Sequence, residues 1–163
     1  MALDMFMKIE TPNVPGESKD KAFAGDIDVL AWSWGASNSG TTHMGGGGGA
    51  GKANFQDLSF TKYVDKGTNV LLTGLAKGTH FAKATLTMRK AGDGQAPYLI
   101  ISMEQVLVTS LSTGGSGGED RLTENVTLNF GKVKVAYKVQ DAGGVLSDGP
   151  KFGWDIEGNA EEQ

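Results

Sequence analysis

The chain contains no cysteine, and only two of its 163 residues are histidines. Without cysteine it has no disulfide framework, no thiolate metal site and no thiol nucleophile. Neither His43 nor His80 has a second metal-ligand residue two to four positions further along the chain. We therefore expect both histidines in solvent and no bound metal.

Long apolar runs are also lacking. No stretch approaches the ~20 apolar residues that a membrane-spanning helix needs. The first ten residues, MALDMFMKIE, lack the basic start and apolar run of a secretory signal. We expect a soluble chain that is made in the cytoplasm, does not insert into a membrane, and leaves the cell only through a dedicated machine.

Basic residues are too few for a nucleic-acid-binding protein. Fifteen lysines and arginines stand against nineteen acidic residues, a formal net charge of -4. Binding to nucleic acid usually requires a basic patch. The nearest candidate is Lys132, Lys134 and Lys138, but these lysines alternate with valines and are typical of the wet face of a strand. We expect no nucleic-acid partner.

The dominant pattern in the sequence is the alternation of apolar and polar residues. The stretch Leu3–Glu10 places Leu3, Met5, Met7 and Ile9 on one face, as expected for a half-buried strand. Similar patterns recur to the end of the chain, without repeats or linkers. At this length they predict one domain, residues 1–163, with a mostly β fold: an antiparallel two-sheet β-barrel.

One short helix interrupts the strands. Thr68 is a candidate N-cap, Leu71, Leu72 and Leu75 form a narrow apolar stripe, and Gly78 follows the last turn. We expect this helix to plug or flank the barrel.

Two places break the alternation of the strands. Ile27 and Val29 lie on one face, but Trp32 and Trp34 lie on the other, which indicates either a strand covered on both faces or a bulge. Apolar residues also change from even to odd positions around Gly131, where we expect a bulge or kink.

A glycine-rich loop runs from Gly40 to Lys52. Its residues Gly46–Lys52 match the spacing G-x-x-x-x-G-K of a phosphate-binding loop. That chemistry also needs a Ser or Thr after the lysine and a helix that begins there. Ala53 follows instead, before a strand pattern, so we expect no bound nucleotide and no cofactor. The glycines are better explained by a flexible loop that becomes ordered when it contacts a partner.

The sequence offers no catalytic signature, and in particular no nucleophile elbow. We therefore expect no enzyme. Trp32 and Trp34 flank Ser33, so the two indoles point together and Ser33 points away from them. The tryptophans are either core aromatics or part of a subunit interface.

Several long stretches, in order along nearly the whole chain, resemble one family. They include GESKDKAFAGDIDVLAWSWG (16–35), THMGGGGGAGKANFQDLSFTKYVDK (42–66), the segment 98–130 and the tail FGWDIEGN from Phe152. These strings resemble Hcp proteins of bacterial type VI secretion, nearest to the Pseudomonas-type branch.

The resemblance implies a phage tail-tube-like fold and a homohexameric ring around a wide channel. Rings stack into a tube that a contractile sheath ejects behind a spike protein, with small effector proteins carried and chaperoned in the lumen. The alternatives are a phage-type tail-tube protein or a monomeric small-ligand-binding β-barrel.

In such a ring, we expect Ser33 to face the lumen and contact effectors, and Trp32 and Trp34 to lie at the subunit interface. The loop that contacts the next ring would comprise Gly45, Gly46, Gly47, Gly48, Gly49, Ala50, Gly51 and Lys52.

Overall fold

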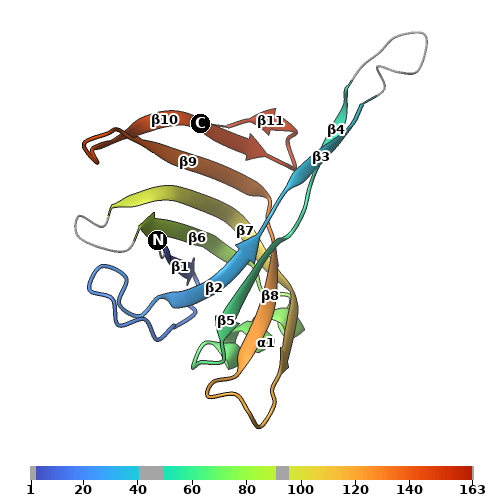
Figure 1. The fold of residues 1–163 in the computed structure, drawn as a ribbon. Helices are drawn as coiled ribbons and strands as arrows, with labels where there is room; N and C mark the ends of the chain where they lie inside the picture. The colour runs from blue at the N-terminus through green and yellow to red at the C-terminus, as the bar shows by residue number, and fades with distance from the viewer. Residues whose placement is uncertain (1–2, 41–49, 91–95, 163) are drawn as a thin grey trace.

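The computed structural model describes residues 3–40, 50–90 and 96–162, which form a barrel with two projections (Figure 1). Its elements are β1 (Leu3–Glu10), β2 (Ile27–Ser33), β3 (Ala36–Gly40), β4 (Ala50–Phe55), β5 (Leu58–Tyr63), α1 (Thr68–Lys77), β6 (Phe81–Lys90), β7 (Pro97–Gly114), β8 (Thr123–Asn129), β9 (Lys132–Gln140), β10 (Leu146–Asp155) and β11 (Ala160–Glu161).

The barrel consists of β7, β6, β1, β2, β5 and β8 in that order, and an additional β7–β8 pairing closes it. Every one of these pairings is antiparallel. Closure is possible because β7 is 18 residues long and pairs with β6 along its first part and with β8 along its second. The prediction of an antiparallel β-barrel is confirmed.

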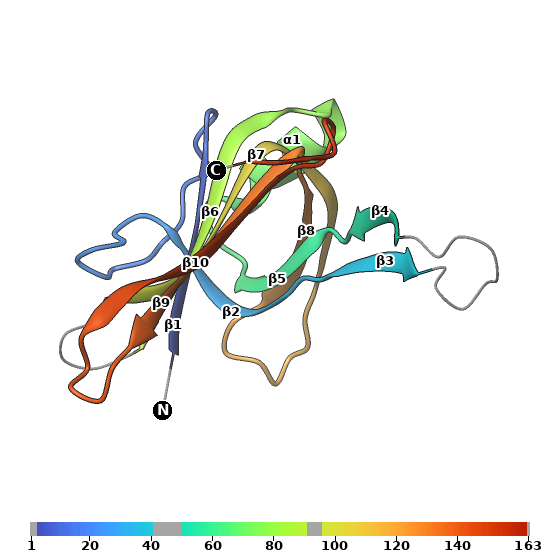
Figure 2. The ribbon, with the colours of Figure 1, turned by 90° about the horizontal axis from the view of Figure 1, so that it is seen from above.

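Two projections leave this barrel (Figure 2). The wing, formed by β9, β10 and β11, continues the sheet from the first part of β7. The arm, formed by β3 and β4, is a separate two-stranded ribbon that extends away from the barrel (Figure 1). Residues 55–64 do not form one continuous strand, because the structure divides this stretch between the end of β4 and β5.

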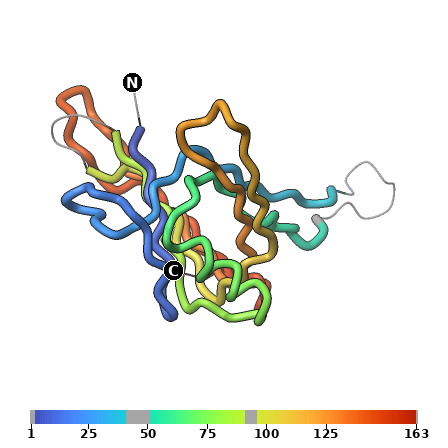
Figure 3. Tube along the Cα trace, turned by 90° about the horizontal axis from the view of Figure 1, so that it is seen from below, coloured from blue at the N-terminus to red at the C-terminus, as the bar shows by residue number. Residues whose placement is uncertain are grey.

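The helix α1 lies across one end of the barrel (Figure 3). Leu71 is fully buried, whereas Leu72, which we expected in the apolar stripe, is 40% exposed. Gly74 allows a close approach, because a Cβ atom there would lie 2.8 Å from the ring of Phe81. The predicted helix is confirmed. The N-cap prediction is wrong, because Thr68 is the first helical residue and Gly67 precedes it as the cap.

Both irregularities in the sequence correspond to breaks in strand pairing. The β2–β5 register shifts between Val29 and Ala31, so of the two explanations for this strand the bulge is correct. At Gly131 the chain passes from β8 in the barrel to β9 in the wing, as expected for a break there. A Cβ atom at Gly131 would lie 2.3 Å from Oε1 of Gln105, so a larger residue there would have to displace the end of that side chain.

Candidate functional site

Ser33 lies on the outer surface of the barrel. The bulge in β2 turns Trp32 toward the core, opposite the buried Phe60, and leaves Ser33 exposed opposite Ser59 of β5. Trp34 follows on the same side as Trp32, and both indoles pack against the core. Strand alternation sets Ser33 opposite the two tryptophans, and the bulge between Val29 and Ala31 decides that the tryptophans face the core and Ser33 faces outward.

The surface around Ser33 is rich in hydroxyl and amide groups. On β5 and β8, Ser59 is opposite Thr127 and Thr61 is opposite Asn125. On β7, Ser110 is also opposite Thr127. We call this surface the hydroxyl face and define it as Ser33, Ser59, Thr61, Ser110, Ser112, Asn125 and Thr127.

The groups on the hydroxyl face bind one another. The Thr61 hydroxyl donates to Oδ1 of Asn125 over 2.7 Å, and the Ser110 and Thr127 hydroxyls are 2.6 Å apart. At the margin, Asp57 accepts hydrogen bonds from Thr109 and Asn129 over 2.7 and 2.9 Å. Since hydroxyls and amides carry no net charge, this face presents donors and acceptors without a strong electrostatic field.

Sequence reasoning found Ser33 but missed the rest of this face. A signal was available in the strand periodicity, because Ser59 and Thr61 alternate with inward Leu58 and Phe60. That the face also includes residues of β7 and β8 follows only from strand pairing.

The tryptophans make extensive contacts within their own chain. The Trp34 indole N–H donates to the backbone carbonyl of Gln56 over 2.9 Å. Its ring lies 6.1 Å from the rings of both Phe55 and Phe130. Both tryptophans nevertheless keep partly exposed surface, so their role at a subunit interface stays a prediction.

The outer side of the other half of the barrel has a different chemistry. Across β1, β6, β7, β9 and β10 the directly opposed residues alternate in charge: Glu10, Lys83, Glu104, Lys132 and Asp155. We call this row the charge ladder. Opposite charges on facing strands attract one another, so the ladder stabilises these pairings.

Lys132 is the best-supported member of the ladder. A hydrogen bond to Glu162, 3.1 Å away, raises the pKa of the Lys132 ammonium, and the charges of Asp155 and Glu104 act in the same direction. Glu162 follows β11, so the end of the described chain lies on the same side of the sheet as Lys132.

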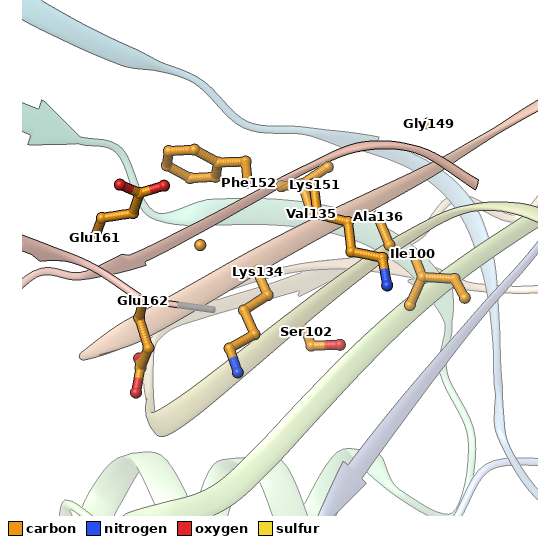
Figure 4. A pocket seen from close by; sticks show the side chains of 11 residues that line it. Ile100, Ser102, Lys134, Val135, Ala136, Gly149, Lys151, Phe152, Glu161 and Glu162 are labelled. Atoms are coloured by element: carbon orange, nitrogen blue, oxygen red, sulfur yellow. The ribbon is translucent and has the colours of Figure 1, made fainter.

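A groove of about 740 Å³ lies on this charged side of the wing (Figure 4). Lys134 and Lys151 point into it from β9 and β10, toward Ser102 on β7, whereas Phe152 points to the opposite side of the sheet (Figure 4). Glu161 and Glu162 flank it, so acidic and basic groups share the groove.

The described part of the predicted stacking loop belongs to the arm, and residues 45–49 fall outside the described residues. Ala50, Gly51 and Lys52 form the start of β4, which pairs with β3 and continues as a strand to Phe55. The arm is largely exposed, and an isolated two-stranded ribbon has little stability of its own in water.

Other site classes find no support in the part of the chain that the structure describes. There is no group of three or more acidic, histidine or cysteine side chains placed to hold a metal ion. No described helix is long and apolar enough to span a membrane. His80 is exposed after α1, whereas His43 lies outside the described residues.

Comparisons with known proteins agree on one family. A family model described as "Type VI secretion system effector, Hcp" matches residues 6–137. Protein hcp1 of Pseudomonas aeruginosa is 61% identical over 163 residues, which cover 99% of each chain.

Solved structures are similar over the same extent. A type six secretion system protein aligns with a TM-score of 0.92 at 29% identity, over 99% of this chain and 100% of that one. Hcp1 from Salmonella typhimurium aligns with a TM-score of 0.81 at 34% identity and the same coverage. The chain therefore belongs to the Hcp family of the type VI secretion system, a family of secreted tube proteins rather than of enzymes.

Proposed function

We propose that six copies of this chain form a ring whose channel is lined by the hydroxyl face, and that stacked rings form a secreted tube carrying small effector proteins. The observation that carries this proposal is the contrast between the neutral face around Ser33 and the charge ladder on the other side of the same barrel. A channel that holds and releases different folded clients benefits from hydrogen-bonding groups without strong charge, since complementary charges make binding selective for particular partners.

The wing offers a surface for contact with a neighbouring subunit. Tyr137, Val139 and Phe152 lie on the side that continues the core face, and they are 47%, 44% and 40% exposed. Large apolar side chains gathered on one face are typical of protein interfaces. Pro150 removes one hydrogen-bond donor from the outer edge of β10, which makes a contact between faces of sheets more favourable than one between strand edges.

The remaining parts of the assembly follow from the same arrangement. Trp32 and Trp34 reinforce the subunit interface beneath the hydroxyl face. The arm and the loop Gly45–Lys52 contact the next ring, because this ribbon extends beyond the barrel (Figure 2). The spike protein and the contractile sheath are the further partners, and the tube leaves the cytoplasm together with the spike.

Native mass spectrometry together with negative-stain imaging tests the ring. We expect sixfold rings, and a 17.1 kDa monomer at micromolar concentration would contradict the proposal. Val139→Lys should shift the wild-type ring toward monomer, because it places a charge in an apolar contact. Lys138→Ala, on the neighbouring residue that faces the other side of β9, is the matched control and should leave rings intact.

Ser33→Gln tests the lumen. The longer side chain should reduce the export or stability of a client effector while ring formation stays normal. Unchanged export of every client, or protection of a cysteine placed at position 33 from labelling in the assembled ring, would overturn the lumen assignment.

A further inference from the structure

An ion pair is buried inside the barrel, directly beneath the hydroxyl face. Lys62 of β5 and Glu124 of β8 stand opposite each other, and both side chains are 0% exposed. The Lys62 ammonium is 2.5 Å from Oε1 of Glu124. Each residue occupies an inward position of its strand that apolar residues otherwise fill, such as Phe60 and Val126. Burying two charges is costly, so the pair needs an explanation other than hydrophobic stability.

The pair joins two strands to the start of the helix. The Lys62 ammonium also donates to Oδ1 of Asp65 over 2.9 Å. The Thr68 hydroxyl donates to Oε1 of Glu124 over 2.6 Å and accepts the Asp65 backbone N–H over 3.1 Å. Thr68 therefore connects α1 to the pair, which explains why its hydroxyl does not cap the helix.

This network is incompletely satisfied. Oε2 of Glu124 is buried and has no hydrogen-bond partner among the described residues. A partly satisfied buried network is less favourable than an apolar contact of the same volume. Stability alone would therefore favour two apolar residues at positions 62 and 124.

We infer that Lys62 and Glu124 are positioning residues that set the register of β5 against β8. The other inward pairs, Leu58 with Leu128 and Phe60 with Val126, are apolar and tolerate a shift of two residues. The same shift would place Lys62 opposite an apolar residue and separate it from Glu124, whose carboxylate would then be buried without its cation, whereas Lys62 would keep Asp65 of its own segment.

The register decides how the hydroxyl face is assembled. A shift of two residues would separate Thr61 from Asn125 and Ser59 from Thr127, and so break the hydrogen bonds across this face. The role of the face as a channel lining rests on the proposed function, but the register itself is a property of the barrel.

Three variants separate register from stability. Lys62→Met leaves Glu124 without its cation and should lower the melting temperature by roughly 10 °C. Lys62→Met combined with Glu124→Leu leaves Asp65 with only the Gly67 backbone N–H, so it should melt well above Lys62→Met alone, yet lose its single register. The charge exchange Lys62→Glu with Glu124→Lys, made together with Asp65→Asn so that the new carboxylate does not stand beside that of Asp65, should restore one register.

Disulfide trapping reads the register, because the chain has no cysteine of its own. Thr61→Cys with Asn125→Cys reports the native pairing, and Thr61→Cys with Thr123→Cys or Thr127→Cys reports a shift of two residues. After refolding and oxidation, only the native pair should form in wild type. In the apolar double variant its yield should fall at least about twofold while a shifted pair appears.

Native pairing alone in the apolar double variant would overturn the inference. If that variant does not fold, the charge exchange decides, since native pairing there supports the inference and shifted pairing overturns it. Native mass spectrometry on the same samples distinguishes the proposed ring from the proposed register role of the pair. If wild type is a monomer but shows the expected trapping pattern, the ring is contradicted and the register role is not.

Discussion

The outer side of β5 and β8 and the outer side of β6, β7 and β9 are both polar, but the first is neutral and the second is charged. On β5 and β8, Ser59 and Thr61 face Thr127 and Asn125. On β6, β7 and β9, Lys83, Glu104 and Lys132 form the middle of the charge ladder. The two halves share one core and one closing strand, β7.

The two halves also differ on their inner sides, where the neutral half contains charged residues and the charged half contains apolar ones. Beneath the charge ladder the inward residues are apolar, for example Leu86 opposite Ile101. Beneath the hydroxyl face lie Lys62 and Glu124. Charges opposite one another on neighbouring strands favour one register over its neighbours. In this barrel they lie outside where the surface is charged and, for Lys62 and Glu124, inside where the surface is neutral.

Arg89→Met should give the largest effect on the charged half. The Arg89 side chain is 3% exposed, lies over the rings of Phe6 and Phe23, and binds Asp4 and Asp20. Its loss leaves two carboxylates without a cation and releases the loop that contains Asp20. We expect the melting temperature to fall by roughly 5 °C, less than for a fully buried pair because both carboxylates are partly exposed. Lys90→Met, at an exposed neighbour, is the control and should change it by less than about 1 °C.

Glu104→Lys should have a smaller effect. The new lysine would stand between Lys83 and Lys132, so three like charges would follow one another across the strands. We expect the melting temperature to fall by about 2–3 °C at low salt, and by less at high salt because ions screen exposed charges. A salt-independent loss would show that the ladder does not act through charge.

Ser33→Lys should change stability least among the substitutions. Ser33 is exposed and its neighbour across the strands is Ser59, so the fold has room for a charge there. We expect a melting temperature within about 1 °C of wild type. If Ser33→Lys were as damaging as Glu104→Lys, the neutrality of the hydroxyl face would be a requirement of folding rather than of function.

The pH dependence gives the finest comparison. The hydrogen bond from Arg89 lowers the pKa of Asp20 below its ordinary value of 3.8. A lowered carboxyl pKa stabilises the fold fully above the unfolded value, and this contribution is lost as the pH falls through the folded value. Wild type should therefore lose the stabilisation from Asp20 as the pH falls below about 3.8. The stability of Arg89→Met should fall less steeply over the same pH range.

Urea midpoints measured from about pH 5 down to about pH 3 check this difference. Burial raises the pKa of Asp26 and Asp28, which act in the opposite direction. Since neither binds Arg89, their contribution should be the same in both proteins. Identical pH slopes for wild type and Arg89→Met would contradict the assignment to Asp20.

Much of the fold could be predicted from local patterns. Alternation placed Met7 and Ile9 inward, and both are fully buried. The short helix and the break at Gly131 were also predictable, because leucine spacing and glycine act within a few residues. The N-cap was not, because the Thr68 hydroxyl is engaged by Glu124, a residue far away in the sequence.

Local sequence patterns predicted less of the candidate site than of the fold. The parity of β5 would have placed Lys62 inward with Leu58 and Phe60, but nothing local names Glu124 as its partner. Likewise the two tryptophans indicated either a bulge or a doubly covered strand, and only the pairing of β2 with β5 decided between them.

By itself, the sequence determined the β class, the position of the helix and the resemblance to the Hcp family, since each depends on residues close together or on whole strings of sequence. Only the tertiary structure decided that β7 closes the barrel against β8, that Ser33 shares a face with Thr61 and Asn125, and that charges form a ladder across five strands. The physical reason is that hydrogen bonding between strands joins residues distant in the chain, and side-chain alternation places a residue on a face without naming its neighbour.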